Sequence, residues 1–77
     1  MTFTDRIEIN PRVMLGKPVI RGTRIPVELI VRMVGQGIGE DEIMREYPRL
    51  TMEDIRAAVI YAAEVVAGED VFTFPAA

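Results

Sequence analysis

The sequence predicts a small, mainly helical α+β domain, in which a short strand and a β-hairpin precede a three-helix bundle with a helix-turn-helix. Its 77 residues allow one compact domain. Near the N-terminus, Gly22-Thr23 separates two β-branched runs, and three later segments carry apolar residues at helical spacing. We therefore expect a single domain over residues 1–77, with the strand and hairpin in residues 1–27, the bundle in residues 28–68 and a tail in residues 69–77.

The strand is expected at Ile7-Glu8-Ile9, where apolar and polar residues alternate. The β-hairpin is expected over Pro18–Val27, with Gly22 at the first central position of a type II′ turn. In this register Arg21 lies opposite Arg24, so both arginines stand at the tip of the hairpin.

The first helix is expected from Val27 to Val34, where valine and isoleucine recur at the i, i+3, i+4, i+7 spacing of one helix face. Gly35 and Gly37 supply its stop. A second helix is expected from Glu40 to Tyr47, because three acidic residues favour its N-terminus and Pro48 ends it.

The third and longest helix is expected to begin after Thr51, which offers an N-cap with Asp54 three residues later, as in a capping box. Apolar residues recur at helical spacing from Ile55 to Val66, and Gly68 fits the left-handed position after the helix end.

Composition narrows the class of protein. Apolar residues make up 49% of the chain, more than a small monomer readily hides, so we expect a homodimer. The chain has no cysteine, which fits a reducing compartment, and no export signal is visible; we expect a cytoplasmic protein. The longest apolar-rich stretch, Ala57–Ala67, contains Glu64 and is far shorter than the roughly 20 residues of a membrane span. No membrane association is therefore expected.

Charge is divided unevenly along the chain. Residues 1–35 carry six Lys/Arg and three Asp/Glu, a net charge of +3, whereas residues 36–77 carry three and nine, a net charge of −6. Because Lys and Arg neutralise phosphates in nucleic-acid complexes, only the N-terminal part suits such contacts.

A set of motifs runs through nearly the whole chain in order: Gly16-Lys17-Pro18-Val19-Ile20, Arg21-Gly22-Thr23-Arg24-Ile25-Pro26-Val27, Glu42-Ile43, Tyr47-Pro48-Arg49-Leu50-Thr51, Asp54-Ile55 and Tyr61-Ala62-Ala63. In these motifs the chain resembles domain of unknown function family 433. The resemblance implies a homeodomain-like helix-turn-helix fold and a regulatory role as an antitoxin encoded beside a nuclease-like toxin with a PIN-type fold. It brings no catalytic residues with it.

The candidate residues for binding DNA or a partner are Lys17, Arg21, Thr23 and Arg24, since two guanidiniums on a rigid turn offer several preorganised donors. Two other interpretations stay open. The arginines either form a merely solvated hairpin end or pair with carboxylates of the same chain, such as Glu28.

The order of the second and third helices is that of a helix-turn-helix, whose second helix normally enters the major groove with its N-terminal residues. Here those residues are Met52, Glu53, Asp54 and Arg56. Carboxylates at this end repel phosphates, so the alternative is that the motif is retained only as a packing unit.

The tail carries Phe72 and Phe74, which are candidate residues for binding a partner because exposed aromatics are effective anchors. The alternatives are that they fold back over their own bundle or onto a twin subunit.

Catalysis is not expected, because the chain has no histidine, cysteine or serine to serve as a tuned base or nucleophile. The acidic run Glu40-Asp41-Glu42 fits a first helical turn better than a metal site, and we expect no metal and no cofactor. The sequence thus predicts an antitoxin-like regulatory protein that dimerises and binds a partner toxin and operator DNA. The alternative is a protein-interaction or oligomerisation module without DNA binding.

Overall fold

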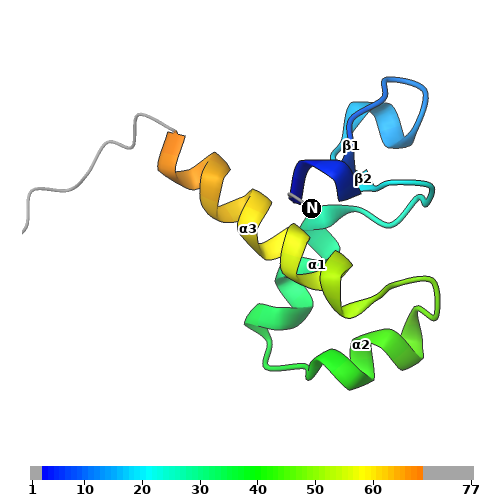
Figure 1. Ribbon diagram of the computed structural model, residues 1–77, viewed down its shortest axis with the longest axis vertical. Helices are drawn as coiled ribbons and strands as arrows, with labels where there is room; N and C mark the ends of the chain where they lie inside the picture. Colours follow the sequence, from blue (N-terminus) through cyan, green and yellow to red (C-terminus); the bar gives the residue numbers. More distant parts are fainter. Residues whose placement is uncertain (1–2, 69–77) are drawn as a thin grey trace, which may run out of the picture.

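The computed structural model describes residues 3–68 and is mainly helical, with a short antiparallel sheet near its N-terminus (Figure 1). The prediction of a small α+β fold is confirmed. The elements, in chain order, are the 3-10 helix η1 (Phe3–Arg6), strand β1 (Ile7–Glu8), the 3-10 helix η2 (Met14–Gly16), strand β2 (Val19–Ile20), and helices α1 (Val27–Gly35), α2 (Glu40–Glu46) and α3 (Met52–Gly68).

The sheet adds a strand partner to the predicted hairpin. β2 pairs antiparallel with β1, in the register Ile7 to Ile20 and Glu8 to Val19. The chain that returns after Gly22 adds a bridge between Val19 and Pro26. On either side of this bridge the Ile20 amide donates to the Ile25 carbonyl at 3.0 Å, and the Val27 amide donates to the Pro18 carbonyl at 2.9 Å. The predicted register across the turn is therefore confirmed, but the segment after Gly22 forms a bridge and not a strand, because its prolines limit its pairing and β1 takes the free edge of β2.

The turn itself is present, but it begins one residue earlier than predicted. The Thr23 amide donates to the Ile20 carbonyl at 2.9 Å, so Arg21 and Gly22 are the central residues. Gly22 has a φ of 78°, which at the second central position is typical of a type II turn and not of type II′. The Arg21 amide meanwhile donates to the Arg6 carbonyl at 2.8 Å, which ties Arg21 to the β1 side.

Helix α1 ends in a Schellman motif. The Gly37 amide donates to the Val34 carbonyl at 3.0 Å and the Ile38 amide donates to the Met33 carbonyl at 3.0 Å, while Gly37 has a φ of 83°. The predicted glycine stop is thus confirmed. It turns the chain sharply into α2.

Helix α3 begins with the predicted capping box. The Asp54 amide donates to Thr51 Oγ1 at 3.2 Å, and the Thr51 amide donates to Asp54 Oδ2 at 3.0 Å. At the other end Gly68 is the last described residue of the helix and does not have a positive φ, so its predicted left-handed conformation is wrong.

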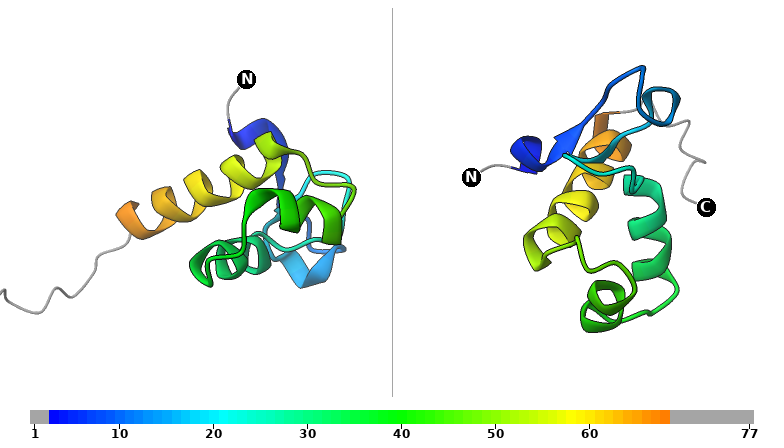
Figure 2. Two further views of the ribbon diagram at one scale, coloured as in Figure 1. Left: turned by 90° about the horizontal axis from the view of Figure 1, so that it is seen from below. Right: turned by 90° about the vertical axis from the view of Figure 1, so that its right-hand side faces the viewer.

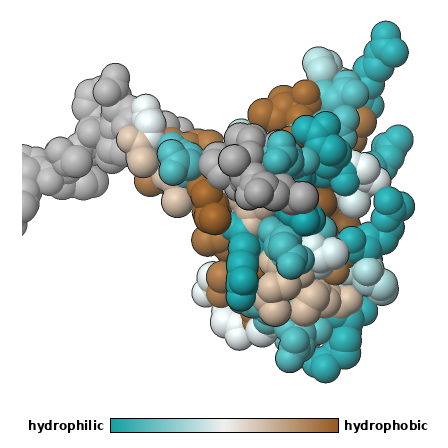
Figure 3. All heavy atoms as spheres, viewed as in Figure 1, coloured by the Kyte–Doolittle hydropathy of each residue, from teal (hydrophilic) through white to brown (hydrophobic). Residues whose placement is uncertain are grey.

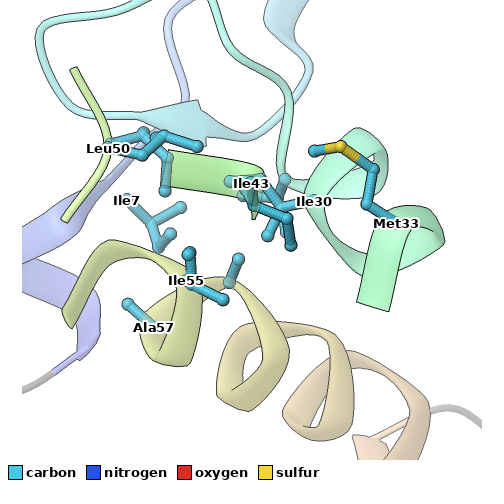
Figure 4. Packing of buried hydrophobic residues seen from close by; sticks show 10 residues of the cluster. Ile7, Ile30, Met33, Ile43, Leu50, Ile55 and Ala57 are labelled. Carbon is cyan, nitrogen blue, oxygen red and sulfur yellow. The ribbon is translucent and has the colours of Figure 1, made fainter. Parts of the chain in front are cut away.

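The core lies where the three helices meet the sheet (Figure 4). Ile43 and Ile30 face Ile55 across this space, and Ile7 and Leu50 close it from the strand and from the loop before α3. Only the N-terminal half of α3 takes part, because its C-terminal half extends beyond α1 and α2 (Figures 1 and 2). One helix therefore belongs half to the core and half to the surface.

Candidate macromolecule-binding surfaces

The candidate residue Arg21 is exposed but is bound to its own chain. Its Nε donates to the Asp5 carbonyl at 2.8 Å, and its Nη2 donates to the Ile7 carbonyl at 3.1 Å. Glu28, one suggested acceptor, is paired elsewhere. The guanidinium of Arg21 therefore holds η1 and β1 against the turn.

Thr23 and Arg24 differ sharply in their surroundings. The Thr23 hydroxyl donates to the Ile20 carbonyl at 2.7 Å and accepts from the Ile25 amide at 3.0 Å, so it completes the turn. Arg24 is exposed, and within residues 3–68 it has neither a hydrogen bond nor an ion pair. The Thr23 hydroxyl is therefore occupied, whereas the Arg24 guanidinium is available to a ligand.

Lys17 lies on the α1 side of the molecule, where its Nζ is 2.7 Å from Glu28 Oε1. Arg32 approaches the other oxygen of the same carboxylate at 3.7 Å. The hydrogen bond and the positive charge of Lys17 lower the pKa of Glu28, with a smaller contribution from Arg32. The positive charge of Lys17 is thus partly neutralised by Glu28 of the same chain.

Two further arginines, which no local sequence pattern indicates, also lie near the turn. Arg49, in the loop before α3, donates to the Gly22 carbonyl at 3.0 Å. Arg6 forms an ion pair with Asp54, in which Nη1 lies 2.9 Å from Oδ1, and Asp54 is only 6% exposed. Because Arg6 and Asp54 are 48 residues apart in the chain, a local sequence pattern does not predict that they pair. We call Arg6, Arg21, Thr23, Arg49 and Asp54 the turn cluster.

The N-terminus of α3 is poorly suited to reading DNA bases. The carboxylate of Asp54 is occupied by Arg6 and by the cap of its own helix. Glu53 and Arg56 are exposed, so this end presents one charge of each sign to solvent. The interpretation of the helix-turn-helix as a packing unit gains support from this arrangement.

The C-terminal half of α3 carries a stripe of exposed apolar residues (Figure 3). Val66 is 62% exposed and Ile60 is 45% exposed, and both exceed what an ordinary core helix leaves open. The residues that we call the α3 stripe are Val59, Ile60, Ala63, Val66 and Ala67.

Two grooves flank this half of the helix. The α2–α3 groove, about 860 Å³ in volume, has Val34, Ile38, Val59 and Ile60 among its lining residues. The α1–α3 groove, about 450 Å³, has an apolar floor that includes Val31, Tyr61 and Val65, and a rim that includes Lys17, Glu28 and Arg32. Both are open to solvent and are lined largely by carbon.

The loop before β2 contains an unusual backbone. Met14 and Leu15 have φ values of 50° and 58°, in the left-handed region that side chains with a Cβ avoid. Leu15 is also 95% exposed. No pattern in the sequence analysis indicated this conformation.

Phe72 and Phe74 lie outside the described residues. Between residues 3 and 68, no group of three or more acidic, histidine or cysteine side chains is arranged to hold a metal ion. No helix in the described part of the chain is both long and apolar enough to cross a membrane.

Comparison with known proteins gives one family. The family described as "Protein of unknown function (DUF433)" matches residues 7–62. A crystal structure of a DUF433 member protein from Anabaena variabilis superposes with a TM-score of 0.74 at 40% sequence identity, covering 80% of this chain and 61% of that one.

Two relatives match in sequence. The uncharacterized protein y4eO of Sinorhizobium fredii is 40% identical over 53 residues, which are 69% of this chain and 24% of that protein. An uncharacterized protein of Archaeoglobus fulgidus is 55% identical over 29 residues, which are 38% of this chain and 81% of that protein. The chain thus spans about a quarter of the length of y4eO.

Proposed function

Because the chain belongs to the DUF433 family of proteins of unknown function, we propose that it is an antitoxin-like regulatory module that binds other proteins and performs no catalysis. The observation that carries the proposal is the exposed apolar C-terminal half of α3. Large apolar side chains at the surface of a small domain mark contacts with other proteins. The module acts in the cytoplasm as a homodimer with a toxin of PIN-type fold as its partner.

The surface that best fits the toxin is the α1–α3 groove. Its floor includes Val31, Tyr61 and Val65, which accept an apolar segment, and its rim is formed by the paired charges of Lys17 and Glu28. Such a surface, with an apolar centre and a polar rim, is typical of protein interfaces.

The test uses the product of the adjacent reading frame, expressed alone and together with this chain. We expect growth arrest by that product alone and relief when the chain is present. Val65→Glu places a charge in the groove and should abolish the relief, because burying an unpaired carboxylate is costly. Gln36→Glu adds the same charge at an exposed site on the end of α1 and should leave the relief intact. Absence of arrest, or of relief by the wild-type chain, would contradict the proposal.

Binding of operator DNA is a second candidate function, favoured by the free guanidinium of Arg24. Arg49, in the loop before α3, adds a second positive charge at this turn through its hydrogen bond to the Gly22 carbonyl. The turn cluster also contains the carboxylate of Asp54, which offsets part of this charge.

Fluorescence anisotropy against the upstream DNA at several salt concentrations tests this second function. If Arg24 neutralises one phosphate, Arg24→Ala should lower the log–log salt slope by about 0.9 without loss of stability. Glu53→Gln should leave binding intact or tighten it, since it removes a carboxylate from the end of α3. If the wild-type protein binds no DNA in a salt-dependent manner, the module acts through proteins alone.

A further inference from the structure

The α3 stripe lies on the face of α3 that points away from the core. Successive residues of a helix are rotated by about 100°, so Val59, Ile60 and Ala63 fall on one side of α3 and the buried Ala58 on another. In the described part of the molecule, the side chains of this stripe remain exposed after α1, α2 and η1 have packed against the helix.

Two opposite charges lie at equal distances on either side of Ile60. Arg56 precedes Ile60 by four residues and Glu64 follows it by four, so all three lie on the same side of the helix. Arg56 and Glu64 are separated by roughly 12 Å along the axis, too far to pair with each other. Within residues 3–68, neither has an ion-pair partner.

We infer that the α3 stripe is the surface on which a second copy of this chain binds, with the two α3 helices antiparallel and Ile60 on the twofold axis. In this arrangement Arg56 faces Glu64 of the partner subunit, and the symmetry repeats the ion pair on the other side. One surface thereby becomes complementary to itself in both shape and charge.

The neighbouring residues fit the same arrangement. Ala63 is small and allows two helices to approach closely around Ile60. An antiparallel partner also carries its own α3 end past Met52, toward the α2–α3 groove.

A parallel pair of helices would not share these advantages. It would place Arg56 next to Arg56 of the partner subunit and Glu64 next to Glu64 of the partner subunit, which costs free energy through like-charge repulsion. Binding of a different protein would not require charges placed symmetrically about Ile60, whereas a twofold axis through Ile60 does. The pattern therefore favours a second copy.

This inference rests on the homodimer of the proposed function and assigns its interface. The chain contains no cysteine, so Ile60→Cys introduces a single thiol. On the twofold axis two such thiols come within disulfide range, and mild oxidation should convert most of the protein to a covalent dimer that a reductant reverses. Glu42→Cys, exposed on α2, is the matched control and should remain mostly monomeric on a non-reducing gel.

A charge exchange tests the register independently. Arg56→Glu and Glu64→Arg should each raise the dissociation constant of the dimer at least about tenfold in sedimentation measurements, because each creates two like-charge contacts. The double variant should restore tight association. Circular dichroism checks that each variant keeps its helices.

The outcomes separate the interface from the proposed function. A wild-type chain that is monomeric at micromolar concentration overturns both this inference and the homodimer. A dimer without the Ile60→Cys disulfide and without charge-exchange rescue overturns the interface alone. A dimer that shows both, in a chain that does not relieve growth arrest, supports the interface and contradicts the antitoxin-like role.

Discussion

In the turn cluster, Arg6, Arg21 and Arg49 all donate to acceptors of the same chain, whereas in the α3 stripe Val66 and Ile60 remain largely in water. The turn cluster is rich in charge, and charged side chains near a turn are candidates for binding a ligand. The α3 stripe is apolar, and apolar side chains at helical spacing are candidates for the core. In the structure the charged region is bonded within the chain, and the apolar region is exposed.

The difference separates stability from binding. A guanidinium that satisfies backbone carbonyls or a buried carboxylate stabilises the fold, because removing it leaves those acceptors unpaired. An apolar side chain on an exposed helix face adds little to the stability of one chain and much to an interface. Substitutions should therefore affect folding in the turn cluster and association in the α3 stripe.

The largest contrast is expected within α3 itself. Ile55→Ala removes a fully buried side chain and should lower the free energy of unfolding by about 2–5 kcal/mol. Ile60→Ala makes the same change on the α3 stripe and should cost the single chain less than about 1 kcal/mol. Urea denaturation at low protein concentration measures both. If Ile55→Ala does not fold, Ile55→Val should still lose about 0.5–1.5 kcal/mol. Equal losses at the two alanine positions would remove the distinction between the core and the exposed stripe.

The next effect concerns the ion pair that joins η1 to α3. Asp54→Ala should lower the free energy of unfolding by about 3 kcal/mol, because it deletes the capping box and leaves Arg6 without its partner. Thermal and urea unfolding measure the loss. The variant lacking both Arg6 and Asp54 side chains should be less destabilised than the sum of the single variants. Additive losses would mean that the two side chains stabilise the protein separately.

A smaller effect is expected at the turn. Gly22→Ala should cost about 1 kcal/mol, since the φ of 78° is unfavourable for a residue with a Cβ although the space around it is open. Gly35, in α1, also faces open space but has no positive φ, so Gly35→Ala should instead add about 0.5 kcal/mol. The two substitutions should shift the melting temperature in opposite directions. A shift of the same sign would contradict the assigned turn.

The smallest effect is a pH dependence at the rim of the α1–α3 groove. The folded-state pKa of Glu28 is lowered, mainly by Lys17, so its contribution to stability is present above the unfolded-state pKa and is lost as the pH falls through the folded-state pKa. Glu28→Gln should therefore be less stable than the wild type near neutral pH, and the difference should shrink in acid. Urea denaturation across the acid range measures this, and added salt should reduce it because the pair is exposed. A difference that grows in acid would reverse the assigned sign.

The local elements were predictable because their causes are local. The helical spacing of valine and isoleucine, the Gly37 stop, the Thr51–Asp54 cap and the proline after α2 each act within a few residues. Accordingly the three helices were predicted at nearly their observed bounds. The partner of β2 and the position of the turn were not, since they depend on β1, which lies about a dozen residues earlier in the chain.

For the candidate site, the sequence by itself determined that the chain carries arginines near a glycine turn and an excess of apolar residues. Only the tertiary structure decided which of these are free. It assigned Arg21 to the carbonyls of Asp5 and Ile7, left Arg24 in solvent, and placed Ile55 and Ile60 of one helix in the core and at the surface. The physical reason is that Ile60 lies roughly 140° around the helix from Ile55, and that a short core covers only the first turns of this 17-residue helix. The apolar spacing along a helix does not indicate where the neighbouring elements end.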